Sequence, residues 1–222
     1  MHLPAPLITL AAAALAEGHR VCLVVRHAER GPITDLARHH DVPLTDHGHA
    51  CAVQGGRRLG AGLPGASRVA WAHSPVHRCR QTAAGLARGL DEHGVVVVDA
   101  GAHDGLGPDY LYAPEEVVRQ YGAGAEHFVR RWFDGHVDPR IIASRAEVSR
   151  RVLDAVGGLL AVHAVSVAVT HDWNVAAVRE QELGVRVEDT GWPAFLDGFV
   201  VARSPAGRVA VRGVSPAVAA VA

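Results

Sequence analysis

Short apolar runs recur along the chain, and each is followed abruptly by polar residues. Four of them cover residues 21–25, 68–72, 95–98 and 165–169, and valine dominates three of the four. Continuous apolar runs of this length are typical of strands buried on both faces of a parallel sheet. We therefore predict four buried strands, with polar residues placed where each strand ends.

Segments with helical character separate these runs. We expect helices over residues 45–63, 76–90, 114–121, 124–133 and 144–160, and another from 171 to about 183. Thr45 and Ser144 are typical N-cap residues, Glu147 stands at the capping-box position after Ser144, and Pro75 suits the first position of a helix. Residues 196–203 and 208–213, separated by Ser-Pro-Ala-Gly, predict a hairpin at the sheet edge.

Strands that alternate with helices predict an α/β fold. We expect a three-layer α/β/α sandwich around a mostly parallel sheet with an antiparallel edge strand. The 222 residues contain no internal repeat and no linker, so one catalytic domain spanning residues 1–222 is expected, with its core over about 20–213. The apolar stretch Leu7–Ala16 is too short to span a bilayer, and it predicts a leading helix that ends near Gly18.

The composition narrows the classes of function. The formal net charge of −1 gives no overall field that would attract nucleic acid, and no membrane partner is expected. All 22 basic residues are arginine, which excludes a P-loop lysine and a Schiff-base lysine. The cysteines Cys22, Cys51 and Cys79 are odd in number and lie in apolar or helical surroundings, so they indicate a reducing compartment and a cytoplasmic protein.

Two of the predicted strands end in a histidine with charged neighbours. Arg26 and His27 follow the run 21–25, and His171 follows the run 165–169. If these strands are parallel neighbours, both histidines lie side by side at the carboxyl edge of the sheet, where α/β proteins bind ligands. Arg78, in the first turn of the helix 76–90, is expected to point into the same crevice, and Arg80 to point elsewhere because residues two apart diverge on a helix.

This set of side chains predicts phosphate chemistry. Arginine presents a planar fork of donors that matches a phosphate, and a neutral imidazole can attack phosphorus and carry the group as phosphohistidine. Arg26 and His27 taken alone would fit an ordinary polar strand end equally well. The second histidine is therefore the decisive observation.

The order of these features resembles the histidine phosphatase superfamily, which includes the cofactor-dependent phosphoglycerate mutases. The features extend from residue 21 to about 200 and are Arg26-His27 after a strand, Leu44-Thr45 with Gly48, the block Ser74-Pro75-Val76-His77-Arg78-Cys79-Arg80-Gln81-Thr82-Ala83, and His171 after a late strand. The resemblance implies a phosphoglycerate mutase-like fold. It also implies that His27 is the nucleophile that becomes phosphorylated, and that Arg26, Arg78 and His171 hold the phosphoryl oxygens.

Two stretches are also similar to the acid-phosphatase and phytase branch of this superfamily, namely Arg26–Pro32 and the pair His171-Asp172. That likeness implies Arg30 as a further phosphate ligand and Asp172 as the proton donor to the leaving oxygen. The chain departs from the pattern at Ala28, where the family usually has glycine, and it lacks the larger helical insert of that branch.

The proton donor stays open at the level of sequence. The shorter-chain branch uses a glutamate after the third strand, but here that region offers Asp99 and Asp104 and no glutamate before Glu115. Asp172 is the first choice and Asp104 the alternative acid. A third reading has no acid at all, which would suffice for a phosphoramidate whose leaving group is easily protonated.

We expect a metal-independent phosphatase that hydrolyses a small-molecule phosphomonoester through a phosphohistidine on His27, with inorganic phosphate as product and no cofactor. Alternatives are a phosphoglycerate mutase-type transferase, a protein phosphohistidine phosphatase and a non-catalytic phospholigand-binding module. A metal-dependent hydrolase would exploit the 15 histidines, but the adjacent pair His39-His40 diverges and has no cysteine or carboxylate at ligand spacing, so no metal site is predicted. The oligomeric state stays open, with a homodimer as one option.

Two loops are expected to shape the substrate pocket. They cover residues 31–43 and 99–114, and the candidate aromatic walls are Tyr110, Tyr112, Trp132 and Trp192. The sequence does not identify the alcohol that the substrate carries.

Overall fold

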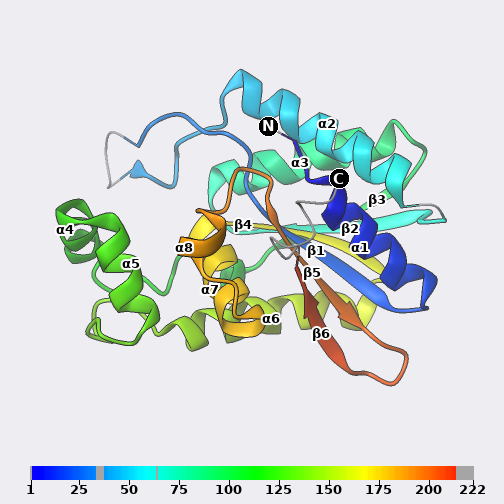
Figure 1. Cartoon of the computed structure of the whole chain (residues 1–222). Helices are drawn as coiled ribbons and strands as arrows, with labels where there is room; N and C mark the ends of the chain where they lie inside the picture. Colours follow the sequence, from blue (N-terminus) through cyan, green and yellow to red (C-terminus); the bar gives the residue numbers. More distant parts are fainter. Residues whose placement is uncertain (1, 34–37, 64, 214–222) are drawn as a thin grey trace.

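The computed structural model describes residues 2–33, 38–63 and 65–213 and contains a six-stranded sheet with the order β3-β2-β4-β1-β5-β6 (Figure 1). Strands β3, β2, β4 and β1 run parallel, whereas β5 pairs antiparallel with β1 and β6 pairs antiparallel with β5. The strands are β1 (Arg20–Arg26), β2 (Arg68–His73), β3 (Val96–Ala102), β4 (Val165–Thr170), β5 (Gly198–Arg203) and β6 (Val209–Arg212). The predicted mostly parallel sheet with an antiparallel edge is confirmed.

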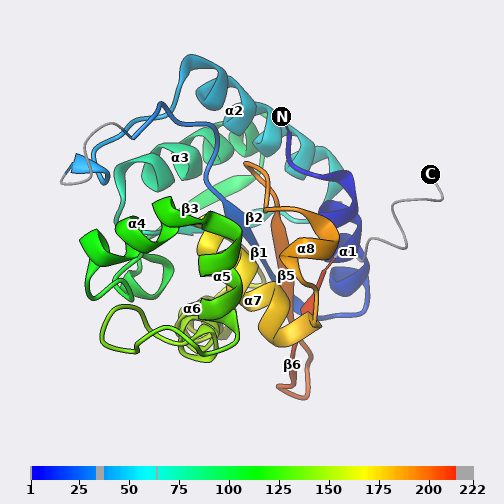
Figure 2. The ribbon, with the colours of Figure 1, turned by 60° about the vertical axis from the view of Figure 1, so that its left-hand side comes forward.

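Helices cover both faces of this sheet, so the predicted three layers are present (Figures 1 and 2). One face is covered by α1, α2 and α3, and the other by α6 and α7, while α4 and α5 pack together beside α7. The helices are α1 (Ala5–Ala16), α2 (Asp46–Gly62), α3 (His77–Asp91), the 3₁₀ turn η2 (Asp104–Leu106), α4 (Pro114–Ala123), α5 (Ala125–Phe133), α6 (Arg145–Val162), α7 (Asp172–Leu183) and α8 (Val187–Thr190).

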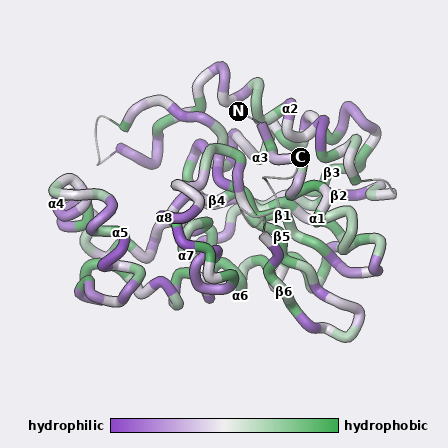
Figure 3. Tube along the Cα trace, viewed as in Figure 1, coloured by the Kyte–Doolittle hydropathy of each residue, from purple (hydrophilic) through white to green (hydrophobic). Residues whose placement is uncertain are grey.

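The alternation of side chains along β1 explains why two separate cores form. Val21, Leu23 and Val25 face α1, α2 and α3, whereas Cys22 and Val24 face α6 and α7. All five are fully buried, and the tube in Figure 3 is accordingly hydrophobic along the central strands. A strand that is apolar on both faces can only sit between two helical layers, so the sequence pattern determines the layering.

Two glycines hold α2 and α3 close together. A Cβ on Gly56 would lie 2.1 Å from the carbonyl oxygen of Leu86, and one on Gly89 would lie 2.1 Å from that of Val53. Helices approach this closely only where side chains are absent. Gly56 of α2 and Gly89 of α3 therefore let the two helices pack closely, and α3 carries Arg78 at its start.

Both predicted caps form, although one helix starts later than expected. Thr45 and Ser144 accept hydrogen bonds from the backbone N–H groups of Gly48 and Glu147. Helix α3 begins at His77 after the N-cap Val76, so the prediction that Pro75 occupies the first helical position was wrong. The hydroxyl of Ser74 instead accepts the Val76 N–H, at 3.3 Å.

The third strand differs from its prediction in position and burial. We expected residues 95–98 to be buried on both faces, but β3 is an edge strand over Val96–Ala102 in which Val96 is 57% exposed. It extends into the predicted loop through a bulge beside β2, where Gly101 takes a φ of 82°. An apolar run shows that a strand forms, but only the strand order shows whether both of its edges are paired.

None of the helices among the described residues is long and apolar enough to cross a membrane. Of the predicted loop 31–43, residues 34–37 lie outside the described part of the chain.

Candidate active site

Strands β1 and β4 place the two histidines together, as predicted. Arg26 pairs with Thr170 at the carboxyl ends of these strands, and the His27 N–H donates to the Thr170 carbonyl at 2.9 Å. The His27 and His171 ring centroids are 5.6 Å apart, and both side chains are buried. Two residues far apart in sequence therefore meet because their strands are parallel neighbours.

The backbone beside His27 selects its tautomer. Its Nδ1 lies 2.8 Å from the Ala28 carbonyl oxygen, which can only accept, so Nδ1 carries the proton. The Ala28 N–H donates to the Thr82 hydroxyl of α3 at 3.0 Å, which fixes this peptide in place. The Ala28 methyl is fully buried in a small apolar cluster with Leu44 and Leu196, so alanine is accommodated where the family usually has glycine. The lone pair of His27 is thereby left on Nε2.

Arg78 bridges the two imidazoles. Its Nε donates to His27 Nε2 at 3.0 Å, its Nη2 donates to His171 Nδ1 at 3.3 Å, and its Nη1 donates to the His39 carbonyl at 2.7 Å. The side chain is only 6% exposed, whereas Arg80 is exposed. The prediction that Arg78 rather than Arg80 points into the crevice is confirmed.

His171 takes the opposite tautomer. Because Nδ1 accepts from Arg78, the proton of a neutral ring lies on Nε2, which is 2.9 Å from the fully buried hydroxyl of Ser74. The thiol of Cys79 lies 3.7 Å from the same nitrogen, but burial raises the pKa of Cys79 to about 12. The thiol therefore stays neutral, and this contact does not form a cysteine nucleophile.

Burial and positive charge keep both imidazoles neutral. Burial, followed by the charge of Arg78, lowers the pKa of His27 to about 3. The same two causes, in the same order, lower the pKa of His171 well below its usual value. The cup therefore has its positive charge on the arginines, and the nitrogen available for attack is unprotonated.

Arg26 forms the second side of the cup. Its Nη1 donates to the Pro193 carbonyl at 2.7 Å, its Nη2 lies 3.0 Å from Asp172 Oδ2, and its guanidinium carbon lies 4.0 Å above the centre of the Phe195 ring. The Phe195 ring also lies 5.7 Å from the His27 ring. Arg26 Nε is buried without a hydrogen-bond partner in the described residues, so a donor remains available to a ligand in the cup.

Asp172 accepts hydrogen bonds on both oxygens. Oδ2 accepts from Trp192 Nε1 at 3.0 Å and forms an ion pair with Arg26, and Oδ1 accepts from the Trp173 backbone N–H at 3.0 Å. This carboxylate therefore connects the Arg26 guanidinium to the Trp192 indole.

Within the described residues, no hydrogen bond joins the remaining predicted residues, Arg30 and Asp104, to either imidazole. Arg30 is half-buried, its Nη1 donates to the Gly31 carbonyl at 2.8 Å, and its charge contributes to lowering the pKa values of Arg26 and Arg78. Asp104 is exposed at the start of η2, and no hydrogen bond of its side chain is found within the described residues.

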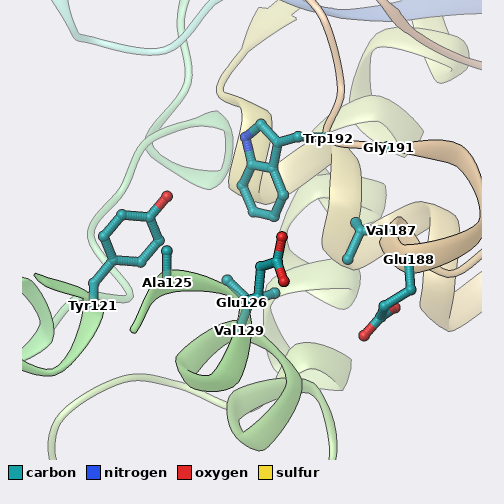
Figure 4. A pocket seen from close by; sticks show the side chains of 8 residues that line it. All are labelled: Tyr121, Ala125, Glu126, Val129, Val187, Glu188, Gly191 and Trp192. Carbon is teal, nitrogen blue, oxygen red and sulfur yellow. The ribbon is translucent and has the colours of Figure 1, made fainter. Parts of the chain in front are cut away.

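Two of the four candidate aromatic walls are core residues. Tyr110 and Trp132 are buried and stack at a centroid distance of 6.2 Å, so their proposed place in the pocket was wrong. Tyr112 is 54% exposed. Trp192 lines a cavity of about 540 Å³ between α4, α5 and the α8 segment (Figure 4).

Sequence reasoning assigned no role to Ser74, Thr82, Pro193 or Phe195. Ser74 and Thr82 lie in the block of residues 74–83 around Arg78 that carries the family resemblance, so this block could have indicated a role for them. Pro193 and Phe195 lie in the segment before β5, and the return of the chain to the sheet in this segment brings them to the cup. No local sequence pattern marks either residue. Residues 2–33, 38–63 and 65–213 contain no group of three or more His, Cys, Asp and Glu side chains arranged to hold a metal ion.

The comparisons with known proteins agree with this geometry. Among solved structures, the fold is similar to a protein named mycobacterial hydrolase 1 (19% identity, 87% of this chain and 96% of that chain covered, TM-score 0.58). It is also similar to mycobacterial glucosyl-3-phosphoglycerate phosphatase (17% identity, 89% and 100% covered, TM-score 0.56) and to Bacillus stearothermophilus YhfR (18% identity, 88% and 98% covered, TM-score 0.56). No curated protein matches in sequence.

The family model named histidine phosphatase superfamily (branch 1) matches residues 22–195. This span includes β1 with His27, α3 with Arg78 and β4 with the following His171. Because the match covers most of the chain, the protein belongs to branch 1 of the histidine phosphatase superfamily.

Proposed function

We propose that this protein is a metal-independent phosphatase that hydrolyses a small phosphomonoester through a phosphohistidine on His27. The observation that carries the proposal is the Arg78 guanidinium, which donates to the unprotonated nitrogens of His27 and His171 in one buried cup. An anion that enters the cup meets arginine donors and a neutral nucleophile together. Most of the rate enhancement then comes from positioning and electrostatic stabilisation.

The nucleophile is Nε2 of His27, and the Ala28 carbonyl keeps the proton on the opposite nitrogen. In the structure the lone pair of Nε2 accepts from Arg78 Nε. When the substrate binds, Arg78 Nε therefore changes its hydrogen-bond acceptor from the His27 imidazole to a phosphoryl oxygen. The new hydrogen bond holds the phosphate, and the lone pair of Nε2 becomes free to attack. Attack breaks the bond from phosphorus to the alcohol oxygen and forms the bond from phosphorus to Nε2, and water then hydrolyses the phosphohistidine.

His171 requires a proton to act as a phosphate ligand. Its Nδ1 faces Arg78 as an acceptor, so His171 can donate from this nitrogen to a phosphoryl oxygen only as the doubly protonated imidazolium. A phosphate dianion favours this charged form. Arg26, with its unpartnered Nε, and Arg30 complete the proposed set of phosphate ligands.

Asp172 is the proposed proton donor to the leaving oxygen, with Asp104 as the alternative acid. The family match is to branch 1, so this role is supported by geometry rather than by the likeness to the acid-phosphatase branch. Asp172 Oδ2 lies 3.0 Å from Arg26 Nη2, which puts the carboxyl next to a phosphate held by that arginine.

The comparisons support a small phosphorylated ligand. The mycobacterial glucosyl-3-phosphoglycerate phosphatase has been solved with inorganic phosphate and with VO3, at TM-scores of 0.51 and 0.54 to this chain. We propose the same class of ligand here. The three free cysteines support the proposed cytoplasmic location, since all are buried and unpaired.

The test of the mechanism is His27→Ala assayed on p-nitrophenyl phosphate in a buffer with a metal chelator. We expect the wild type to turn over and to form an acid-labile phosphoprotein in rapid-quench experiments, and the variant to do neither while keeping its fold by circular dichroism. His127→Ala is the matched control, because that histidine is exposed on α5. Near wild-type turnover by His27→Ala would refute the mechanism.

The same cup could also serve a phosphoryl transferase. Isomerised rather than dephosphorylated phosphoglycerate as the product would assign the protein to the mutase type. Restoration of a chelated enzyme by zinc would assign it to the metal-dependent class.

A further inference from the structure

A second cavity adjoins the proposed phosphate cup. It has a volume of about 540 Å³, within the range typical of small-molecule sites, and it lies between the α4 and α5 helices on one side and the α8 segment on the other (Figure 4). Trp192 belongs to both sites, because its ring lines the cavity and its Nε1 donates to Asp172. Two contacts of 3.0 Å each separate the Trp192 indole from the Arg26 guanidinium through Asp172 Oδ2.

The rings of Tyr121 and Trp192 form the aromatic wall of this cavity, and the Trp173 ring, which is not among the lining residues, contacts both of them. The Tyr121 ring lies 5.6 Å from the Trp173 ring, and the Trp173 ring lies 6.4 Å from the Trp192 ring. The faces of such rings attract cations as well as apolar groups.

The charges that line the cavity are all negative. Glu126 and Glu188 contribute carboxylates, and the lining contains no arginine or histidine. Glu188 is partly neutralised, because Arg130 Nη1 lies 3.3 Å from it and Arg186 Nε lies 3.5 Å from it. Glu126 has no ion pair or hydrogen bond within the described residues, and Figure 4 shows its carboxylate pointing from α5 toward Trp192.

We propose that this cavity binds the alcohol part of the substrate and that this part carries a positively charged nitrogen. The substrate class is then a phosphomonoester of an amino alcohol or of a quaternary ammonium alcohol, with its phosphate on Arg26 and its nitrogen between Glu126 and the aromatic wall. The inference rests on the proposed phosphatase function and names the substrate of that same site.

The proposal also predicts which phosphomonoesters are excluded. A substrate with a second anionic group, such as 3-phosphoglycerate, would bring that group toward Glu126 and Glu188, and no arginine or histidine in the cavity lining would receive it. A neutral alcohol of the same shape would fill the cavity but lose the attraction of the carboxylate and the rings. Charge, rather than shape, is therefore the property that selects the substrate.

The experiment compares choline phosphate with 3,3-dimethylbutyl phosphate, which has the same shape but a carbon in place of the charged nitrogen. We expect kcat/KM of the wild type to be roughly tenfold higher for choline phosphate, in line with a desolvated cation on an aromatic face. 3-Phosphoglycerate is expected to be the poorest of the three. Glu126→Gln should lower the ratio of choline phosphate to its neutral analogue about fivefold.

The matched control is Glu115→Gln, because Glu115 is an exposed carboxylate on α4 that lines a different cavity. It should leave the ratio unchanged. A ratio near one in the wild type, a ratio unaffected by Glu126→Gln, or a preference for glucose 6-phosphate over choline phosphate would overturn the inference.

These failures can be distinguished from failure of the proposed function. If the wild type hydrolyses p-nitrophenyl phosphate in a His27-dependent manner but shows no preference for the charged substrate, the function stands and the cationic subsite is wrong. If the wild type hydrolyses no phosphomonoester at all, both are wrong.

Discussion

The two buried histidines should make the folded protein sensitive to mild acid. His27 is 2% exposed and its pKa is lowered to about 3, whereas in an unfolded chain a histidine titrates near pH 6.5. Between these values the unfolded chain binds one more proton than the folded protein. A group with a depressed folded pKa contributes stability that is present above pH 6.5 and is lost as the pH falls toward 3.

The size of the effect follows from the two pKa values. On lowering the pH from 7 to 5, the protonation of His27 in the unfolded state should reduce the free energy of unfolding by about 2 kcal/mol. His171, whose pKa is lowered in the same direction, adds to this loss. Such a change is a large part of the ~5–15 kcal/mol that stabilises a typical domain.

The assay is urea unfolding at pH 7 and pH 5 in buffers without phosphate, for the wild type and for His27→Asn. The difference in unfolding free energy between the two pH values should be smaller in His27→Asn by about 2 kcal/mol, whatever the variant costs at pH 7. His127→Asn, at an exposed position of α5, is the control. If the wild type and His27→Asn lose equal stability between pH 7 and 5, the conclusion that His27 is held neutral by burial is refuted.

Two further predictions concern the acid and the helix contact. Asp172→Asn should lower the turnover of alkyl phosphates about a hundredfold more than that of p-nitrophenyl phosphate, whose leaving group needs no proton; if Asp104→Asn gives this selective loss instead, Asp104 is the acid. Gly89→Ala should lower the free energy of unfolding by about 1–3 kcal/mol, measured in urea, because its Cβ would lie 2.1 Å from a carbonyl oxygen of α2. Gly158→Ala on α6 meets nothing within 4 Å and should be neutral or stabilising, so an equal loss in both variants would contradict the packing argument.

The strand pattern predicted the site because neighbouring parallel strands end at the same edge of a sheet. The apolar runs before Arg26 and before His171 implied two strands, and the abrupt change to polar residues implied their ends. Helical spacing selected Arg78 over Arg80 for a similar reason, since residues two apart on a helix point in different directions. These conclusions need only the local periodicity of the sequence and the directions in which side chains leave a strand or a helix.

Other features depend on which surfaces meet in three dimensions. The sequence could not show that β3 lies at an edge, because an apolar run looks the same whether one or both of its edges are paired. It also could not separate Tyr110 in the core from Trp192 at the cavity, since both are aromatic residues in irregular segments.

The sequence by itself therefore determined the α/β layering, the family and the placement of one histidine at the end of each of two strands. These follow from periodicity and from motifs that act over a few residues. Only the tertiary structure decided the hydrogen bonds of Arg78 to both imidazoles, the link of Asp172 to Arg26 and Trp192, and the acidic aromatic cavity beside them. These depend on side-chain directions and on contacts between segments 20 or more residues apart, which no local pattern encodes.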